Sequence, residues 1–215
     1  MNKIVKQVIS IYRDKKEEFD KRLVDFKKAG KSDRAVLHEL IFCIFTPQSK
    51  AVSCWECVEA IIEKKLMLSS SPSQLLKLRQ INMVRFKNKK ARFAVMARDR
   101  FVKKGKITIR KYLSGFESVF DARKHLAREI KGYGYKEASH FLRNIGFYED
   151  VAILDRHILK NLKLMGVIKK VPSAVTPSEY LNIEDKMRGF SEKINIPMGA
   201  LDLVLWYKET GKIFK

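Results

Sequence analysis

Cysteine is scarce in this sequence of 215 residues, and its three cysteines all precede residue 58. Cys54 and Cys57 have the spacing of half a metal or redox site, but no second pair follows them. The surrounding segment, AVSCWECVEAII, has the apolar periodicity of a helix. We therefore expect Cys43, Cys54 and Cys57 to be reduced thiols that are partly buried, and we expect no metal at them.

Long apolar runs are also missing, since none approaches the ~20 residues of a membrane-spanning helix. The N-terminal segment MNKIVKQVISIYRDKKEEF is amphipathic and lacks the apolar core of a signal peptide. We expect a cytoplasmic protein that has no membrane partner.

Acidic residues are few, with 24 Asp and Glu against 45 Lys and Arg, which gives a net charge of +21. Such an excess favours a polyanionic partner. Residues 85–111 contain twelve basic residues and one acid, Asp99, interleaved with apolar positions. A basic run is usually a solvated face, but here it could line a DNA groove and make binding strongly dependent on salt.

Almost every segment has a helical apolar period, and hydrophobic residues form 46% of the chain. Ser32 is placed to cap a helix, and Gly211 to end the last one. KITIR at 106–110 is the one strand-like segment, and it is too short to anchor a sheet. We predict an all-α fold with two helical lobes around a DNA-binding cleft. Residues 1–215 would form one unit, with a central lobe at about 32–130 and a second lobe from the termini and the hairpin region, about 131–215.

The segment IKGYGYKEASHFLRNIGFYEDVAILDRHI contains a candidate helix-hairpin-helix motif. Two amphipathic helices flank KGYGY, and Gly132 and Gly134 can both take a positive φ and leave their N–H groups uncovered. N–H groups at a helix N-terminus bind anions, so this hairpin is a candidate site for binding a DNA phosphate independently of base sequence. A plain corner between two helices is the alternative.

Lys136 falls in the first turn of the second hairpin helix. The positive end of the helix dipole disfavours an ammonium there, and the neighbouring Lys131 adds to that effect. A neutral lysine is an amine nucleophile that can form a Schiff base. The alternative is a surface lysine close to a phosphate.

Asp155 follows the apolar run VAIL and precedes another helical segment. It is either an N-cap or a carboxylate that stabilises a cationic sugar or takes a proton. His157 lies two residues later and is interpreted as structural or phosphate-facing. No second histidine or carboxylate has metal-ligand spacing, so we expect no metal.

An enzyme that acts on a base must remove it from the stack and hold it between apolar faces. Phe86 and Phe93 are candidates for this, and so is Trp206 with Asp202 one helical turn before it. Core packing is the alternative for the aromatic residues, and solvent exposure for Asp202.

The pattern IKGYGYKEAS…VAILDRHI resembles the helix-hairpin-helix and Gly/Pro…Asp signature of the endonuclease III superfamily of DNA glycosylases. A lysine in the Gly-x-Gly-x-Lys slot marks its bifunctional glycosylase/lyase members. GYKEASHFLRNIGF and LDLVLWYKETGKIFK most resemble the archaeal-type (type 2) 8-oxoguanine DNA glycosylase/AP lyases. The resemblance runs from ELIFCIFTPQSKA to the last residue.

The resemblance implies a prokaryotic base-excision repair enzyme that acts as a monomer, without a cofactor, on double-stranded DNA containing a damaged base. Lys136 would attack C1′ of the damaged nucleotide, assisted by Asp155. Phe86 and Trp206 would sandwich the base, and Lys215 would reach into the same pocket. Gln48 resembles a residue that fills the gap left by the flipped base.

Two departures from the superfamily are visible. No cysteine follows Cys57, so the iron–sulfur cluster of endonuclease III is not expected, and Lys131 stands where many relatives have proline. A glycosylase/lyase for another oxidised base and a non-catalytic DNA-binding module remain as alternatives.

Overall fold

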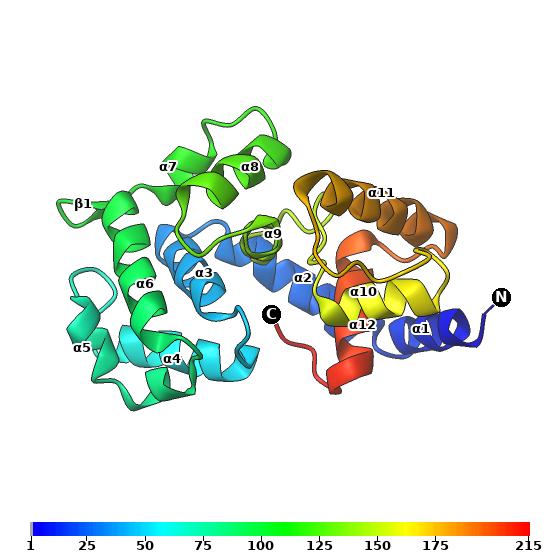
Figure 1. Ribbon diagram of the computed structural model, residues 1–215, viewed down its shortest axis with the longest axis horizontal. Helices are drawn as coiled ribbons and strands as arrows, with labels where there is room; N and C mark the ends of the chain where they lie inside the picture. Colours follow the sequence, from blue (N-terminus) through cyan, green and yellow to red (C-terminus); the bar gives the residue numbers. More distant parts are fainter. Residues whose placement is uncertain (1) are drawn as a thin grey trace. The chain divides into compact units, whose positions relative to one another are not determined.

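The computed structural model describes residues 2–215, and these residues are predominantly helical (Figure 1). The one sheet in this range pairs two short antiparallel strands, with Val102 opposite Ile107. The all-α prediction is therefore confirmed. The elements are α1 (Lys3–Asp14), α2 (Lys16–Ala29), α3 (Asp33–Phe45), α4 (Ala51–Glu63), α5 (Pro72–Leu76), η1 (Arg79–Met83), α6 (Lys87–Phe101), β1 (Val102–Lys103), β2 (Lys106–Ile107), α7 (Ile109–Leu113), α8 (Val119–Glu129), α9 (Tyr135–Asn144), α10 (Arg156–Leu164), α11 (Pro177–Lys193) and α12 (Met198–Thr210).

The chain divides into two compact units. The central unit is Ala29–Phe141, and the terminal unit combines the residues up to Lys28 with Leu142–Lys215. We predicted that the hairpin would group with the termini, with the boundary near residue 130. The hairpin groups with the central unit instead, because the Tyr133 hydroxyl donates to the carbonyl oxygen of Leu40 at 2.9 Å.

In the central unit, α3 is the buried helix, and α4, α6 and α7 pack around it (Figure 1). Ser32 caps it as predicted, since its hydroxyl accepts from the Ala35 N–H at 3.3 Å. Nine of the ten residues from Val36 to Phe45 are buried, and the exception is His38. A helix that is apolar on nearly every side is stable only inside a fold, and α3 is accordingly surrounded.

In the terminal unit, α12 takes the same central place and is packed by α1, α10 and α11. Every residue from Met198 to Leu205 is buried. At Gly199 an added Cβ would lie 2.7 Å from Cδ2 of Tyr148, so glycine permits this close approach. Gly211 ends the helix in the left-handed conformation, with φ +69°, as predicted.

The three cysteines form no disulfide, and they are completely buried where partial burial was expected. Burial raises the pKa of Cys54 to about 11 and that of Cys57 to about 12, so both thiols keep their protons at neutral pH. Within residues 2–215 no three His, Cys, Asp or Glu side chains are grouped to hold a metal ion. The helices of this range are also too short or too polar to cross a bilayer.

Candidate active site

The turn between α8 and α9 depends on Gly132. Its φ of +92° lies in the left-handed region, which glycine adopts at little cost. A Cβ at this position would lie 2.8 Å from Cδ2 of Phe93, so the turn also needs a residue without a side chain. Phe93 thereby has a packing role beneath the hairpin. The predicted backbone conformation is confirmed at Gly132.

Gly134 behaves differently from the prediction. Its φ lies outside the left-handed region, and its N–H donates to Oε2 of Glu137 at 3.1 Å. Glu137 is in the first turn of α9, where the helix dipole stabilises a carboxylate. We expected this N–H to be uncovered. The side chain of Glu137 occupies it because a carboxylate three residues into a helix can fold back onto the preceding N–H.

The same carboxylate contacts the candidate nucleophile. Nζ of Lys136 lies 2.8 Å from Oε1 of Glu137, and the two side chains are 29% and 12% exposed. Lys136 is thus partly sheltered from solvent. Because this contact occupies Nζ, Glu137 must move away before Lys136 can attack a sugar carbon.

Asp155 caps α10 with one of its two carboxylate oxygens. Oδ1 accepts from the N–H of His157 at 2.8 Å and from the N–H of Ile158 at 2.9 Å. Oδ2 accepts no hydrogen bond from residues 2–215. The two interpretations of Asp155 are therefore compatible, because the capping oxygen fixes the carboxylate and the second oxygen stays available.

Trp206 lies on α12 with the ring of His157 against it. The two ring centroids are 5.5 Å apart and the planes are nearly perpendicular. Nδ1 of His157 lies 3.7 Å from Oε2 of Glu209. A hydrogen bond from Lys160 to Glu209 is the main reason why the pKa of that carboxyl falls to about 2. His157 is therefore held by Trp206 and Glu209 while about half of its side chain remains exposed.

Asp202 lies inside the terminal unit. Its Oδ2 is 3.3 Å from Nε of Arg143, and both side chains are 4% exposed. Burial raises the pKa of the Asp202 carboxyl to about 6, although the nearby Arg143 acts in the opposite direction. We expected this residue to contact a flipped base or solvent. The structure pairs it with Arg143 instead, because an acid on the buried face of α12 needs a cation beside it.

A chain of contacts runs from this pair to the C-terminal tail. The guanidinium of Arg143 lies 4.7 Å from the ring centroid of Phe26, and that of Arg22 lies 4.9 Å from the same ring. Nε of Arg22 then donates to the carbonyl oxygen of Phe214 at 2.9 Å. The tail that carries Lys215 is therefore tied to α2.

Phe86 and Gln48 share an unusual backbone. Phe86 is the N-terminal cap residue of α6, with φ +59° and ψ +35°, and it is 53% exposed. Gln48 lies in the turn between α3 and α4 with φ +55° and is also exposed. The guanidinium of Arg85 lies 5.0 Å from the centroid of the Phe86 ring. Both predicted contact residues are thus presented to solvent.

Lys90 was not predicted to be a site residue, and the basic run at 85–111 was interpreted as one surface. Lys90 is 5% exposed and Arg98 is 7% exposed, so these two cations lie inside the central unit. The burial of Lys90 could have been predicted from the spacing of the apolar residues of α6. Lys90 precedes Ala94, Ala97 and Phe101 at spacings of four, three and four, which places it on the buried stripe of α6.

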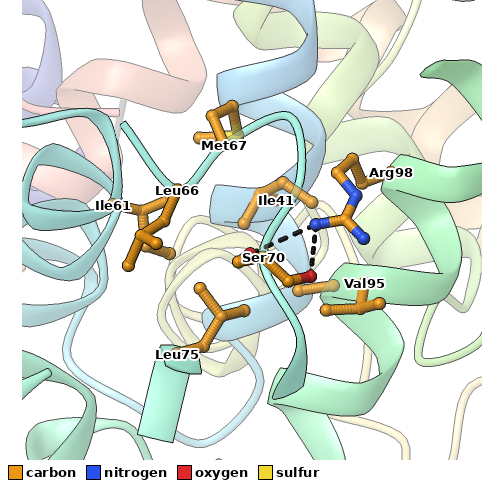
Figure 2. A pocket seen from close by; sticks show the side chains of 9 residues that line it. Ile41, Ile61, Leu66, Met67, Ser70, Leu75, Val95 and Arg98 are labelled. Carbon is orange, nitrogen blue, oxygen red and sulfur yellow. Dashed lines mark hydrogen bonds between the residues drawn. The ribbon is translucent and has the colours of Figure 1, made fainter. Parts of the chain in front are cut away.

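A small cavity lies elsewhere in the central unit, between α3, α4 and α6 (Figure 2). Arg98 donates to the carbonyl and hydroxyl oxygens of Ser70 at its wall, as the dashed lines show. None of the predicted site residues lines it. The lining residues are Ile41, Ile61, Leu66, Met67, Ser70, Leu75, Ala94, Val95 and Arg98.

Comparison with known proteins gives one consistent result. Residues 19–196 match the family described as 8-oxoguanine DNA glycosylase. The chain is 41% identical over its whole length to an 8-oxoguanine DNA glycosylase/AP lyase of Fusobacterium nucleatum, of which it covers 99%.

Solved structures agree with this. The 8-oxoguanine DNA glycosylase of Thermotoga maritima is 33% identical, with a TM-score of 0.85, and the similarity covers 98% of each chain. The 8-oxoguanine glycosylase/lyase of Methanocaldococcus jannaschii, solved with a 15mer DNA containing 8-oxoguanine, is 36% identical with a TM-score of 0.83. The similarity covers 97% of this chain and 100% of that one. This chain therefore belongs to the 8-oxoguanine DNA glycosylase family.

Proposed function

We propose that this protein excises 8-oxoguanine from double-stranded DNA and then cleaves the abasic strand by β-elimination. One observation carries the proposal: Lys136 stands in the first turn of the helix that follows the Gly132 turn, in a chain of this family. The M. jannaschii relative was solved with DNA that contains this lesion. The net charge of +21 suits the same partner.

Lys136 supplies the nucleophile. After Glu137 releases it and its proton has left, the amine attacks C1′ of the damaged nucleotide. The bond from C1′ to N9 breaks, and the base leaves with a proton. The sugar ring then opens, and the lysine nitrogen and C1′ form a protonated Schiff base.

Strand cleavage follows from that intermediate. The Schiff base acidifies the hydrogens on C2′, and removal of one of them breaks the bond from C3′ to its phosphate oxygen. Water then hydrolyses the Schiff base and returns Lys136 as an amine. No atom changes its oxidation state through an external partner, so the reaction needs no redox cofactor. The carboxylate of Asp155 assists by stabilising the positive charge that develops on the sugar.

The remaining site residues have recognition roles in this proposal. The rings of Phe86 and Trp206 stack on the extruded base, and Gln48 fills the space that the base leaves. The backbone N–H of Gly132 holds a phosphate, with His157 as a further phosphate contact. The N–H of Gly134 joins them once Glu137 has released it together with Lys136. Because Asp202 is buried beside Arg143, we assign it to supporting α12 and no longer to contacting the base.

We further propose that the protein works as a monomer in the cytoplasm of a prokaryotic cell. The curated relatives come from bacteria and archaea, whose DNA lies in that compartment. Repair of DNA by this chemistry requires one nucleophile for one lesion, which a single chain provides.

A panel of duplexes tests the function. Each duplex carries one 8-oxoguanine, one oxidised pyrimidine, one abasic site or no lesion, and the single-turnover rates of base release and strand cleavage are measured separately. We expect 8-oxoguanine to be released fastest and the abasic strand to be cut without base release. Faster release of the oxidised pyrimidine would assign another substrate, and tight binding without any release would make the protein a binding module.

Lys215→Ala is expected to slow 8-oxoguanine release more than cleavage of a preformed abasic site. Arg22 holds the preceding residue, so the Lys215 side chain starts from a fixed backbone. An ammonium that contacts the altered edge of the base contributes only when a base is present. The loss of one such contact corresponds to ~1–3 kcal/mol, or roughly a five- to hundredfold change in the ratio of the two rates.

Lys212→Ala is the matched control, because it removes the same charge from an exposed position in the same tail. It should weaken both reactions equally through DNA affinity alone. Equal ratios in the two variants would show that Lys215 takes no part in recognising the base.

A further inference from the structure

Four exposed residues of the central unit other than glycine have a left-handed backbone: Gln48, Lys65, Phe86 and Lys104. Two of them, Gln48 and Phe86, are predicted site residues. Gln48 has φ +55° and Phe86 has φ +59°, and neither is a glycine. Left-handed backbone at such residues costs free energy, and it persists only where surrounding contacts impose it. The contacts that impose it here meet at one buried cation.

Lys90 supplies the first part of that constraint. Its Nζ donates to the carbonyl oxygens of Phe45 and Pro47, both at 2.6 Å, and to Oγ of Ser49 at 3.0 Å. An ammonium has three N–H donors, so all three are used by the turn that contains Gln48. Lys90 therefore has no donor left for a DNA phosphate.

Ser49 extends the constraint to Phe86. Its Oγ accepts from the backbone N–H of Arg85 at 3.0 Å, in addition to accepting from Lys90. Arg85 is the residue before Phe86, so one hydroxyl group joins the two turns. We call Lys90, Ser49 and the backbone groups that they bind the Lys90–Ser49 clasp.

Keeping a charge at position 90 is costly. Burial lowers the pKa of Lys90 to about 8, with the nearby Lys136 adding to that effect and Cys54 and Glu137 opposing it. A methionine of similar length would fill the space without desolvating a charge, but it would leave the carbonyl oxygens of Phe45 and Pro47 without this donor. The clasp therefore stabilises the fold, and its geometry also places the two turns.

We infer that Lys90 and Ser49 are positioning residues that set Gln48 and Phe86 for base extrusion and base stacking. The inference rests on the proposed function, in which those two residues contact the lesion. The inference predicts different effects on the two reactions of the enzyme. Release of the base needs the turns at Gln48 and Phe86 in place. Cleavage of a preformed abasic site has no base to extrude or stack and depends on Lys136.

The test compares Ser49→Ala and Lys90→Met with wild type in single-turnover release of 8-oxoguanine and in cleavage of an abasic duplex. We expect the ratio of release to cleavage to fall by roughly tenfold or more in each variant. Roughly tenfold corresponds to the loss of one buried hydrogen bond, whereas Ser49→Ala removes two of the hydrogen bonds described above and Lys90→Met removes three. Ser49→Thr keeps the hydroxyl and should restore the ratio. If Lys90 and Ser49 were merely structural, base release and strand cleavage would slow together, and Ser49→Thr would behave like Ser49→Ala.

Arg98→Met is the matched control. Arg98 is a buried cation on the same helix that binds the carbonyl and hydroxyl of Ser70 beside the small cavity (Figure 2). Its loss should lower the thermal unfolding temperature and leave the ratio unchanged. If Lys90→Met shifts the ratio no more than Arg98→Met does, and Ser49→Ala matches Ser49→Thr, the positioning role is refuted.

The outcomes remain distinguishable from failure of the proposed function. A wild-type protein that releases no 8-oxoguanine overturns the function before any variant is compared. An active wild type with an unchanged ratio in the variants overturns the clasp alone. Should Lys90→Met not fold by circular dichroism, the comparison of Ser49→Ala with Ser49→Thr decides the matter.

Discussion

Lys136→Gln is expected to abolish covalent trapping of the protein on damaged DNA by borohydride. Reduction by borohydride captures only a Schiff base, and glutamine has no amine with which to form one. Strand cleavage should fall by roughly 10⁴–10⁶-fold, the scale observed when a catalytic nucleophile is removed. Gels of trapped complex and single-turnover cleavage assays measure the two effects.

Lys131→Gln is the control for that variant. It removes the same charge from the same hairpin, at an exposed position next to Gly132. Trapping should persist in this control even if DNA affinity declines. A trapped complex of normal yield with Lys136→Gln would show that another amine forms the Schiff base.

Asp155→Asn is expected to separate the cap from the chemistry. Asparagine keeps a carbonyl oxygen at the position of Oδ1, and Asn and Asp are nearly equivalent as N-caps. The fold should therefore survive, with little change in thermal unfolding. Release of 8-oxoguanine should slow by roughly 10²–10⁴-fold, the usual contribution of a positioned acid or base. Single-turnover rates and circular dichroism measure the two quantities.

Thr176→Ala is the control for Asp155→Asn, because it removes a helix cap of the terminal unit that has no proposed part in catalysis. Thr176 caps α11 by accepting from the Glu179 N–H at 3.3 Å, and no site residue lies on that helix. Its loss should cost ~1 kcal/mol of unfolding free energy and leave the catalytic rate intact. If Asp155→Asn behaves in the same way as Thr176→Ala, the carboxylate is a cap and nothing more.

The sequence predicted those features that local spacing determines. Gly132 was identified because a glycine in a hairpin between two helices can take a positive φ, and Gly211 because helices commonly end on a left-handed glycine. Asp155 was recognised in both of its possible roles, because an acid before a helical pattern is a preferred cap.

Features that depend on contacts between distant residues were not predicted. Asp202 was expected at a base pocket, but its partner Arg143 lies 59 positions earlier, and sequence spacing does not pair them. Lys90 was counted as one more surface charge, because its three acceptors lie more than 40 positions away in another turn. The Gly134 N–H was expected to be uncovered because the reach of the Glu137 side chain was not considered.

The division of the chain also has a consequence for the order in which the protein is made. The central unit is one continuous segment, Ala29–Phe141, whereas the terminal unit is built from both ends of the chain. As synthesis proceeds from the N-terminus, the central unit is complete while the terminal unit still lacks α12, the helix against which α1 packs. Helix α1, whose Val5 and Val8 the finished fold buries, therefore lacks its packing against α12 until that helix is translated.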